Sequence, residues 1–386
     1  MGRQTENTKS GVKHVPFQII RNDITKVKAD AIVNTANPRP YYAAGTDSAI
    51  YEAAGAEALL RARKKIGDIA PGQAAVTKAF ALNARYIIHT VGPLWRDGEH
   101  AERETLRSCY ARSLALADEL GCESIAFPLI ATGTYGFPKD EALHIALSEI
   151  QRFLLTHEML VSLVVFDRRA VELSENLMGG IRQFIDDHAV QELHARERRT
   201  EAPGNTLRRW KYRGREHAAF NGVAAPREDV QADAAFDSEA PGLSTPSPAM
   251  APMAPMAAES SMAGMCLEDV LGSAGESFQQ RLFQLIDESG MDDVAVYKKA
   301  NIDRKVFSRI RCKPDYKPTK KTAVAFAIAL ELDLPTMTDL LSRAELAFSP
   351  SNTFDLIITY FVTNHIYDIF EINAALFKYG QPILGE

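Results

Sequence analysis

The 386-residue sequence is poor in cysteine: it has four, and no two of them have C-x-x-C spacing. Structural zinc sites and disulfide frameworks usually need closely spaced cysteines, so we expect neither. The sequence also lacks a run of about eighteen apolar residues, so we expect no membrane-spanning helix and no membrane partner. The opening residues, M-G-R-Q-T-E-N-T-K-S, contain no apolar segment, so we expect no secretory signal. These absences favour a reducing cytoplasm.

A strong excess of charge of one sign is missing too. The net charge is -6, with 24% charged and 46% hydrophobic residues, as in ordinary soluble proteins. The charge is unevenly spread along the chain, so the total excludes no class of partner. A chain of 386 residues exceeds one comfortable core, so we expect at least two domains.

Short apolar runs alternate with amphipathic stretches between residues 15 and 190. The apolar runs predict strands at residues 15–20, 31–33, 74–77, 86–91, 124–130 and 160–166. The amphipathic stretches predict helices at residues 47–66, 102–120, 139–156 and 171–188. Several strands are apolar almost throughout, as expected when both faces of a sheet are covered. The first domain, residues 1–190, is therefore predicted to be a three-layer α/β/α sheet with ligands at the carboxyl ends of its strands.

The composition changes after residue 188. Residues 194–215 are rich in Arg, residues 228–239 are acidic, and residues 241–265 are built from Pro, Ala, Met and Ser. Such segments bury too little apolar area to offset chain entropy, so we expect a flexible, disordered linker over residues 191–265.

Apolar residues return with helical spacing from residue 266 onward, without convincing strands. The helices predicted there cover residues 277–288, 293–300, 303–311, 321–332, 336–346, 353–363 and 366–378. Residues 266–386 are therefore expected to form a separate all-α domain.

Two turns in the first domain are suited to phosphate. In the first, a buried strand is followed by a polar turn with Asn34 and Asn37, a loop of small residues, and a helix that opens near Asp47. Backbone amides at such a helix start bind anions readily, and two amides with an acid beside them suggest a sugar phosphate. In the second, residues 131–138 lie between a buried strand and a helix, and Gly133 and Gly136 let the backbone approach a ligand.

Five motifs in these regions occur in the order known from one family. They are N-D-I-T at 22–25, D-A-I-V-N-T-A-N at 30–37, G-T-D-S-A-I-Y-E-A-A-G at 45–55, H-T-V-G-P at 89–93 and A-T-G-T-Y-G-F-P at 131–138. Because it has these five motifs in this order, the first half of the chain resembles a macro domain of bacterial type. That module binds ADP-ribose and, in many members, hydrolyses ADP-ribosyl bonds.

The resemblance implies where the parts of ADP-ribose bind. Asp23 would accept a hydrogen bond from the adenine amino group beside Ile24, and Phe166 could stack on adenine. Asn34 and Asn37 would contact the distal ribose. The loop at 131–138 would hold the diphosphate and distal ribose, with Tyr135 and Phe137 closing over the sugar. The complete implied set of ligand contacts is Asp23, Ile24, Asn34, Asn37, Ala44, Gly45, Thr46, Asp47, Ala131, Thr132, Gly133, Thr134, Tyr135, Gly136, Phe137 and Phe166.

For catalysis the resemblance implies Asp47, supported by Asn37. An acid at this place helps to position or deprotonate a water that attacks the anomeric carbon of the distal ribose, and no metal or cofactor is expected. The simpler alternative is that Asp47 only caps its helix, since Asp is common at that position. The leading hypothesis is hydrolysis that removes ADP-ribose from modified proteins or deacetylates O-acetyl-ADP-ribose.

The same region motivates a reader that binds ADP-ribose without turnover. Tyr42, Ala43, Ala44 and Gly45 stand where many hydrolytic members have four glycines. Side chains there narrow the approach to the diphosphate and restrict positive φ. A reader of this kind would act through the second domain.

In the second domain, residues 293–313 resemble a helix-turn-helix of the phage-repressor type, with a turn near Asn301 and Asp303 capping the second helix. Residues 291–321 contain ten Lys or Arg against four Asp, a local charge of +6. Such a stripe can serve DNA phosphates. The candidate DNA contacts are Lys305, Arg309, Lys313, Lys317 and Lys320. The alternatives are a helical interaction module with a solvated basic face and an assembly module; no oligomeric state can be inferred.

Overall fold

The computed structural model describes residues 15–42, 45–166, 171–200 and 276–385. Residues 201–265 of the expected linker lie outside the described residues, as do Ala43, Ala44 and the expected start of the helical domain at residues 266–275. Within the described residues, no helix is long and apolar enough to cross a bilayer.

The described N-terminal part contains a sheet of six strands: β1 (Phe17–Arg21), β2 (Ala31–Thr35), β3 (Ala74–Lys78), β4 (Tyr86–Thr90), β5 (Ser124–Pro128) and β6 (Leu160–Val165). Their order is β1-β6-β5-β2-β4-β3, and all neighbours are parallel except β3 and β4. Every predicted strand is confirmed, with ends shifted by no more than two residues.

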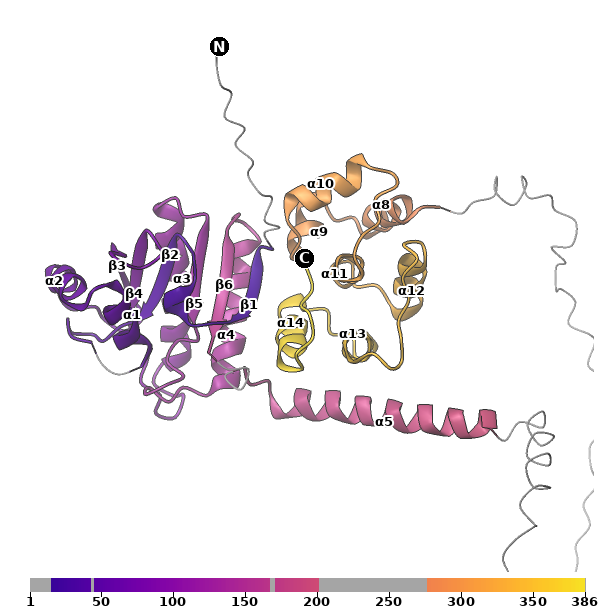
Figure 1. Ribbon diagram of the computed structural model, residues 1–386, viewed down its shortest axis with the longest axis horizontal. Coiled ribbons are helices and arrows are strands. Elements are labelled where there is room, and N and C mark those ends of the chain that lie inside the picture. Colours follow the sequence, from indigo (N-terminus) through magenta and orange to yellow (C-terminus); the bar gives the residue numbers. More distant parts are fainter. Residues whose placement is uncertain (1–14, 43–44, 167–170, 201–275, 386) are drawn as a thin grey trace, which may run out of the picture. The chain divides into compact units, whose positions relative to one another are not determined.

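Helices cover both faces of this sheet (Figure 1). One layer holds α1 (Thr46–Ala54), α2 (Ala56–Ile66) and the short η1 (Ile24–Lys26); the other holds α3 (Glu102–Glu119) and α4 (Lys139–Leu154). Successive side chains of a strand point to opposite faces. Ile32 accordingly packs in the cluster with α1 and α2, whereas Val33 packs in the cluster with α3 and α4. The predicted three-layer α/β/α architecture is confirmed.

Two predicted helices of the N-terminal part differ most from the structure; in the C-terminal part, the helices predicted at 321–332, 336–346 and 366–378 run over 320–329, 334–342 and 369–378. The helix expected at residues 47–66 is two helices, because Gly55 has a φ of +94° and interrupts the hydrogen-bond ladder between α1 and α2. The helix expected at residues 171–188 is α5 (Glu175–Thr200), which starts later and continues into the expected linker. Residues 189–200 are mostly Gln, Glu, Leu, Ala and Arg, which favour helix without supplying an apolar stripe.

The described C-terminal part is all-α. Its helices are α8 (Phe278–Ser289), α9 (Asp293–Lys299), α10 (Arg304–Cys312), α11 (Lys320–Ala329), α12 (Leu334–Ser342), α13 (Thr353–Thr363) and α14 (Ile369–Lys378). Each starts after a polar residue whose side chain accepts a backbone N–H of the first turn: Ser277, Asp292, Asp303, Thr319, Asp333, Asn352 and Asp368. These caps satisfy N–H groups that the helix itself leaves unpaired, which fixes where each helix begins.

Asn301 joins the helical part to the edge strand β1. It has a φ of +54° and a buried side chain. Its Oδ1 accepts from the Phe17 N–H at 2.8 Å, and its Nδ2 donates to the Phe17 carbonyl at 2.9 Å. The Phe17 ring also lies 4.7 Å, centroid to centroid, from that of Phe370 in α14. Polar groups of the edge strand are therefore paired by a side chain rather than left open.

Candidate functional site

The carboxyl ends of β2, β4 and β5 lie at one edge, because these strands are parallel neighbours. The loop that leads from β2 to α1 and the loop that follows β5 therefore begin at the same edge. Asn34 in β2 lies in register with His89 in β4. This is the edge at which ligands gather in open α/β sheets.

Asp47 lies at this edge in the first turn of α1, and its side chain is only 4% exposed. One carboxylate oxygen accepts a hydrogen bond from Asn34 Nδ2 at 2.7 Å, and the other accepts from Asn37 Nδ2 at 3.1 Å. The N-cap of α1 is Gly45, which has a φ of +90° and no side-chain cap. Asp47 is thus not the cap, and its carboxylate is held in place by two amides instead.

The side chain of His89 helps to hold Asn34 against Asp47. Its ring is fully buried, with Nδ1 3.1 Å from Asn34 Nδ2 and Nε2 2.9 Å from Thr77 Oγ1. An amide N–H can only donate, so Nδ1 is the accepting nitrogen and Nε2 carries the proton. Burial lowers the pKa of His89 to about 3. His89 is therefore a neutral structural residue.

A hollow of about 270 Å³ lies at the start of α1 and the ends of β5 and β6. It is lined by Asn22, Asp23, Ile24, Gly45, Thr46, Ala49, Pro128, Val164 and Phe166. The Phe166 ring is 81% exposed, so its face is open to a ligand. The hydroxyl and N–H of Thr25 both donate to Asp23 Oδ1, which lowers the pKa of Asp23. Among the described residues, none donates a hydrogen bond to Asp23 Oδ2, so this oxygen can accept one from a ligand.

The loop after β5 exposes backbone donors. Ala131 has a φ of +65° and Gly136 one of +68°. Within the described residues, the N–H groups of Thr132, Gly133, Thr134 and Tyr135 have no protein acceptor. Successive N–H groups of this kind form a concave site for an anion. Burial raises the pKa of Tyr135, and the charges of Tyr41 and Asp47 raise it further. Asp47 lies in α1, so the loop after β5 and the start of α1 are close enough to interact electrostatically.

The side chains of Phe137 and Asn34, both expected to contact the ligand, are buried in the protein instead. Phe137 is only 2% exposed and packs in the core against Trp95, with ring centroids 4.6 Å apart, so it does not close over a sugar in this structure. Its apolar ring gains more from the core than from a half-solvated loop. Asn34 is fully buried behind Asp47, so it orients the carboxylate rather than facing a ribose. Ala44 lies outside the described residues.

Tyr51 is a buried neighbour of Asp47 on α1, and the sequence did not identify it as part of the site. It is 1% exposed, and the ring of Tyr42 stacks on it at 4.6 Å between centroids. Burial raises the pKa of Tyr51 to about 12, and the charge of Asp47 acts in the same direction. The phenol is therefore protonated at neutral pH. Through this stack Tyr42 packs against α1, although it is still 40% exposed. Tyr42 is the first of the four residues that stand where many hydrolytic macro domains have glycines.

Elsewhere in the described residues, Asp97, His100 and Glu102 bring possible metal ligands within 4.8 Å of one another. These groups already hold the loop before α3: Glu102 accepts from the His100 N–H, and Asp97 accepts from the Glu99 N–H. These hydrogen bonds to the backbone of the loop explain how the three side chains come together.

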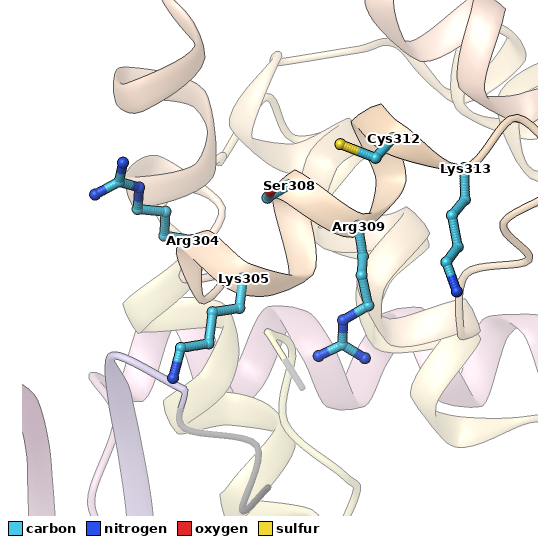
Figure 2. Close-up of a pocket in the computed structure, with 6 residues that line it drawn as sticks. All are labelled: Arg304, Lys305, Ser308, Arg309, Cys312 and Lys313. Carbon is cyan, nitrogen blue, oxygen red and sulfur yellow. The ribbon is translucent and has the colours of Figure 1, made fainter.

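A second polar surface lies on α10. Arg304, Lys305, Ser308, Arg309, Cys312 and Lys313 line an open groove (Figure 2). Figure 2 shows Lys305, Arg309 and Lys313 extending in the same direction from the helix. None of the groove's four cations pairs with a carboxylate in the part of the chain that the structure describes.

The other two candidate DNA contacts are engaged. Lys320 donates to the carboxylate of the buried Asp355 at 2.6 Å and to the Ala347 carbonyl at 2.7 Å, so it is a structural residue. Lys317 pairs with Glu345 at 2.6 Å, although both side chains are exposed. The sequence shows the charges of this region but not which of them are neutralised by distant carboxylates.

Comparison with known proteins concerns the N-terminal part. A family model described as Macro domain matches residues 33–146. A macro domain-containing protein of Methanosarcina mazei is 46% identical over 143 residues, which are 37% of this chain and 76% of that protein. A Citrobacter rodentium protein named O-acetyl-ADP-ribose deacetylase is 42% identical over 167 residues, 42% of this chain and 94% of that protein. A solved structure, the Oceanobacillus iheyensis macrodomain with ADP, is 37% identical and covers 41% of this chain and 90% of its own, with a TM-score of 0.39. Through its N-terminal part, the chain belongs to the macro domain family.

Proposed function

We propose that the N-terminal part binds ADP-ribose and hydrolyses an ADP-ribosyl bond, either in O-acetyl-ADP-ribose or in an ADP-ribosylated protein. The observation that carries this proposal is the Asp47 carboxylate, which two amides hold at the ligand edge of the sheet. The name of the Citrobacter rodentium relative, O-acetyl-ADP-ribose deacetylase, supports this class of substrate.

In the proposed reaction, adenine lies in the hollow between Asp23 and Phe166, and the diphosphate accepts hydrogen bonds from the loop after β5. Asp47 accepts a proton from a water molecule while the water oxygen attacks the acetyl carbonyl carbon or the anomeric carbon of the distal ribose. The bond from that carbon to the leaving group breaks, and the leaving group takes up a proton. Deacetylation then yields acetate and ADP-ribose.

The test compares the full chain with its Asp47→Ala and Asp47→Asn variants. Loss of a general base typically costs about 10²- to 10⁴-fold in kcat. We expect the rate at which ADP-ribose is released from the substrate to fall by this factor in both variants. Both variants should still bind free ADP-ribose. The matched control is Glu52→Gln, an exposed position on the same helix. Equal rates for the native protein and both Asp47 variants would remove the catalytic role and leave an ADP-ribose reader.

We further propose that α10 binds nucleic acid through its phosphates. The specific observation is the charge of Lys305, Arg309 and Lys313 beside Arg304, which pairs with no carboxylate among the described residues, whereas Lys317 and Lys320 each pair with one. Phosphate binding releases counterions, so the affinity falls steeply with salt.

Fluorescence anisotropy of the full chain with duplex DNA tests this second proposal. We expect log affinity to fall with log salt with a slope of about -2 to -4, for two to four phosphate contacts. Arg309→Gln lowers affinity and makes the slope shallower, while Lys317→Gln changes neither. Absence of binding at low salt would refute the proposal and favour a module that recruits protein.

A further inference from the structure

Arg63, on α2, is among the largest fully buried side chains of the described residues, with 1% exposure. It shares the buried stripe of this helix with Leu59, four residues earlier. A Leu or Met at this position would avoid the cost of burying a cation. The charge on an otherwise apolar stripe therefore calls for a specific reason.

The Arg63 guanidinium is bound to backbone carbonyl oxygens. Nη2 donates to the carbonyls of Asn37 and Pro38, both at 3.1 Å, and Nη1 donates to the carbonyl of Gly67. In the described residues it forms no ion pair within 4.0 Å. A planar guanidinium offers donors on separate nitrogens in a fixed geometry, so it can hold this turn and the Gly67 carbonyl at once, whereas a lysine offers one nitrogen on a flexible stem.

What Arg63 holds is the turn after β2. The Pro38 carbonyl also accepts from the Ile69 N–H at 2.9 Å, so the turn is tied to α2 and to the segment after it. The side chain of Asn37, on the same turn, donates to Asp47. The backbone that carries one of the two amides on Asp47 is thus fixed by Arg63.

Arg63 also supplies charge to this region. Burial lowers its pKa, while Tyr51, Asp47 and Asp68 oppose that shift. A guanidinium stays protonated at neutral pH even so. A fixed positive charge close to Asp47 favours the ionised carboxylate.

We infer that Arg63 is a positioning residue for hydrolysis, which holds the Asn37–Pro38 turn and through Asn37 directs the Asp47 carboxylate at the substrate water. The inference rests on the proposed function of Asp47. Its two contributions, geometry and charge, are separable by substitution. Arg63→Lys keeps the charge and loses the fork, whereas Arg63→Met loses both.

Kinetics on the full chain tests this. The control is Arg61→Met on the same helix, where the exposed Arg61 only pairs with Glu57 one turn away. We expect kcat to fall at least about tenfold in Arg63→Lys and Arg63→Met, with KM changed less than about threefold, because the loss is in orientation. In Arg63→Met the acid limb of the kcat profile moves to higher pH, because the carboxylate loses a positive charge, while Arg63→Lys leaves the limb in place. Unchanged kcat in both Arg63 variants would overturn the inference.

A double-mutant cycle with Asn37→Ala keeps the inference falsifiable if Arg63→Met fails to fold. If Arg63 acts through Asn37, Arg63→Lys adds little to the loss already caused by Asn37→Ala. Additive losses would contradict the inference.

A readout without turnover separates this inference from the proposed function. The side-chain amide signals of Asn37 in ¹⁵N NMR should shift in Arg63→Lys and not in Arg61→Met. If the native protein hydrolyses nothing while these signals shift, the proposed function fails, but the finding that Arg63 holds the turn with Asn37 stands. If turnover is present and the signals do not move, the positioning role fails.

Discussion

The buried His89 makes the stability of the protein depend on pH in a defined direction. Its pKa falls from 6.5 to about 3 on folding, because burial disfavours the charged ring. Between these values the unfolded chain binds a proton that the folded chain does not, so stability rises with pH across this window. The contribution is complete above about pH 6.5 and is lost as the pH falls towards 3. Each pH unit below about 6.5 lowers the free energy of unfolding by about 1.36 kcal/mol. About 2 kcal/mol of stability is therefore lost between pH 7 and pH 5.

The assay is urea unfolding of the full chain at pH 7 and pH 5, compared with His89→Gln. A glutamine has no titration and can still accept from Asn34 and donate to Thr77. Titration of all other groups is shared by the two proteins and cancels in the difference. We expect the native protein to lose about 2 kcal/mol more than His89→Gln on acidification. The exposed His100→Gln serves as control and should follow the native protein.

A difference between native and His89→Gln below about 0.5 kcal/mol would refute the assigned state of His89. It would mean that the ring is protonated in the folded protein at pH 5. Asn34 Nδ2 could then no longer donate to it, and the account of how Asn34 is held against Asp47 would fail with it.

Two further predictions concern stability. Asn301→Gly keeps the positive φ but leaves the Phe17 N–H and carbonyl without their side-chain partner, so urea unfolding should show a loss of about 2 to 4 kcal/mol; a loss under 0.5 kcal/mol would contradict the pairing. Lys320→Met leaves the carboxylate of the buried Asp355 without its cation and should cost about 3 kcal/mol, while the exposed Lys317→Met should change stability by less than about 0.5 kcal/mol. Equal effects of the two lysine variants in the same assay would show that Lys320 is not a structural residue.

The sequence predicted the sheet and most helices well because each signal is local. Apolar runs such as 31–33 have no place in an aqueous loop, and acids such as Asp303 mark the start of a helix by capping it. The break at Gly55 was missed because the apolar spacing of α1 and α2 runs on across it. The extension of α5 was missed because helix propensity without an apolar stripe resembles a linker.

The site was predictable in part, for a different reason. Motif order brought Asp23, Asn37 and Asp47 to one edge, but it could not show which side chains face a ligand and which face the core. Phe137 illustrates this, since an aromatic residue in a glycine-rich loop can serve either purpose and only packing against Trp95 decides. Arg63 carried a usable signal, a charge on the buried stripe of an amphipathic helix. The cytoplasmic location inferred from cysteine usage stays a prediction.

Calorimetric titration of the full chain with ADP-ribose tests the central claim most directly, because it asks whether the loop before α1 and the loop after β5 bind one nucleotide diphosphate together. We predict saturable binding with one site per chain, weakened at least about tenfold by Asp23→Ala, which removes the carboxylate offered to the adenine amino group. Absence of heat at millimolar ADP-ribose, or binding that Asp23→Ala leaves unchanged, would contradict the account.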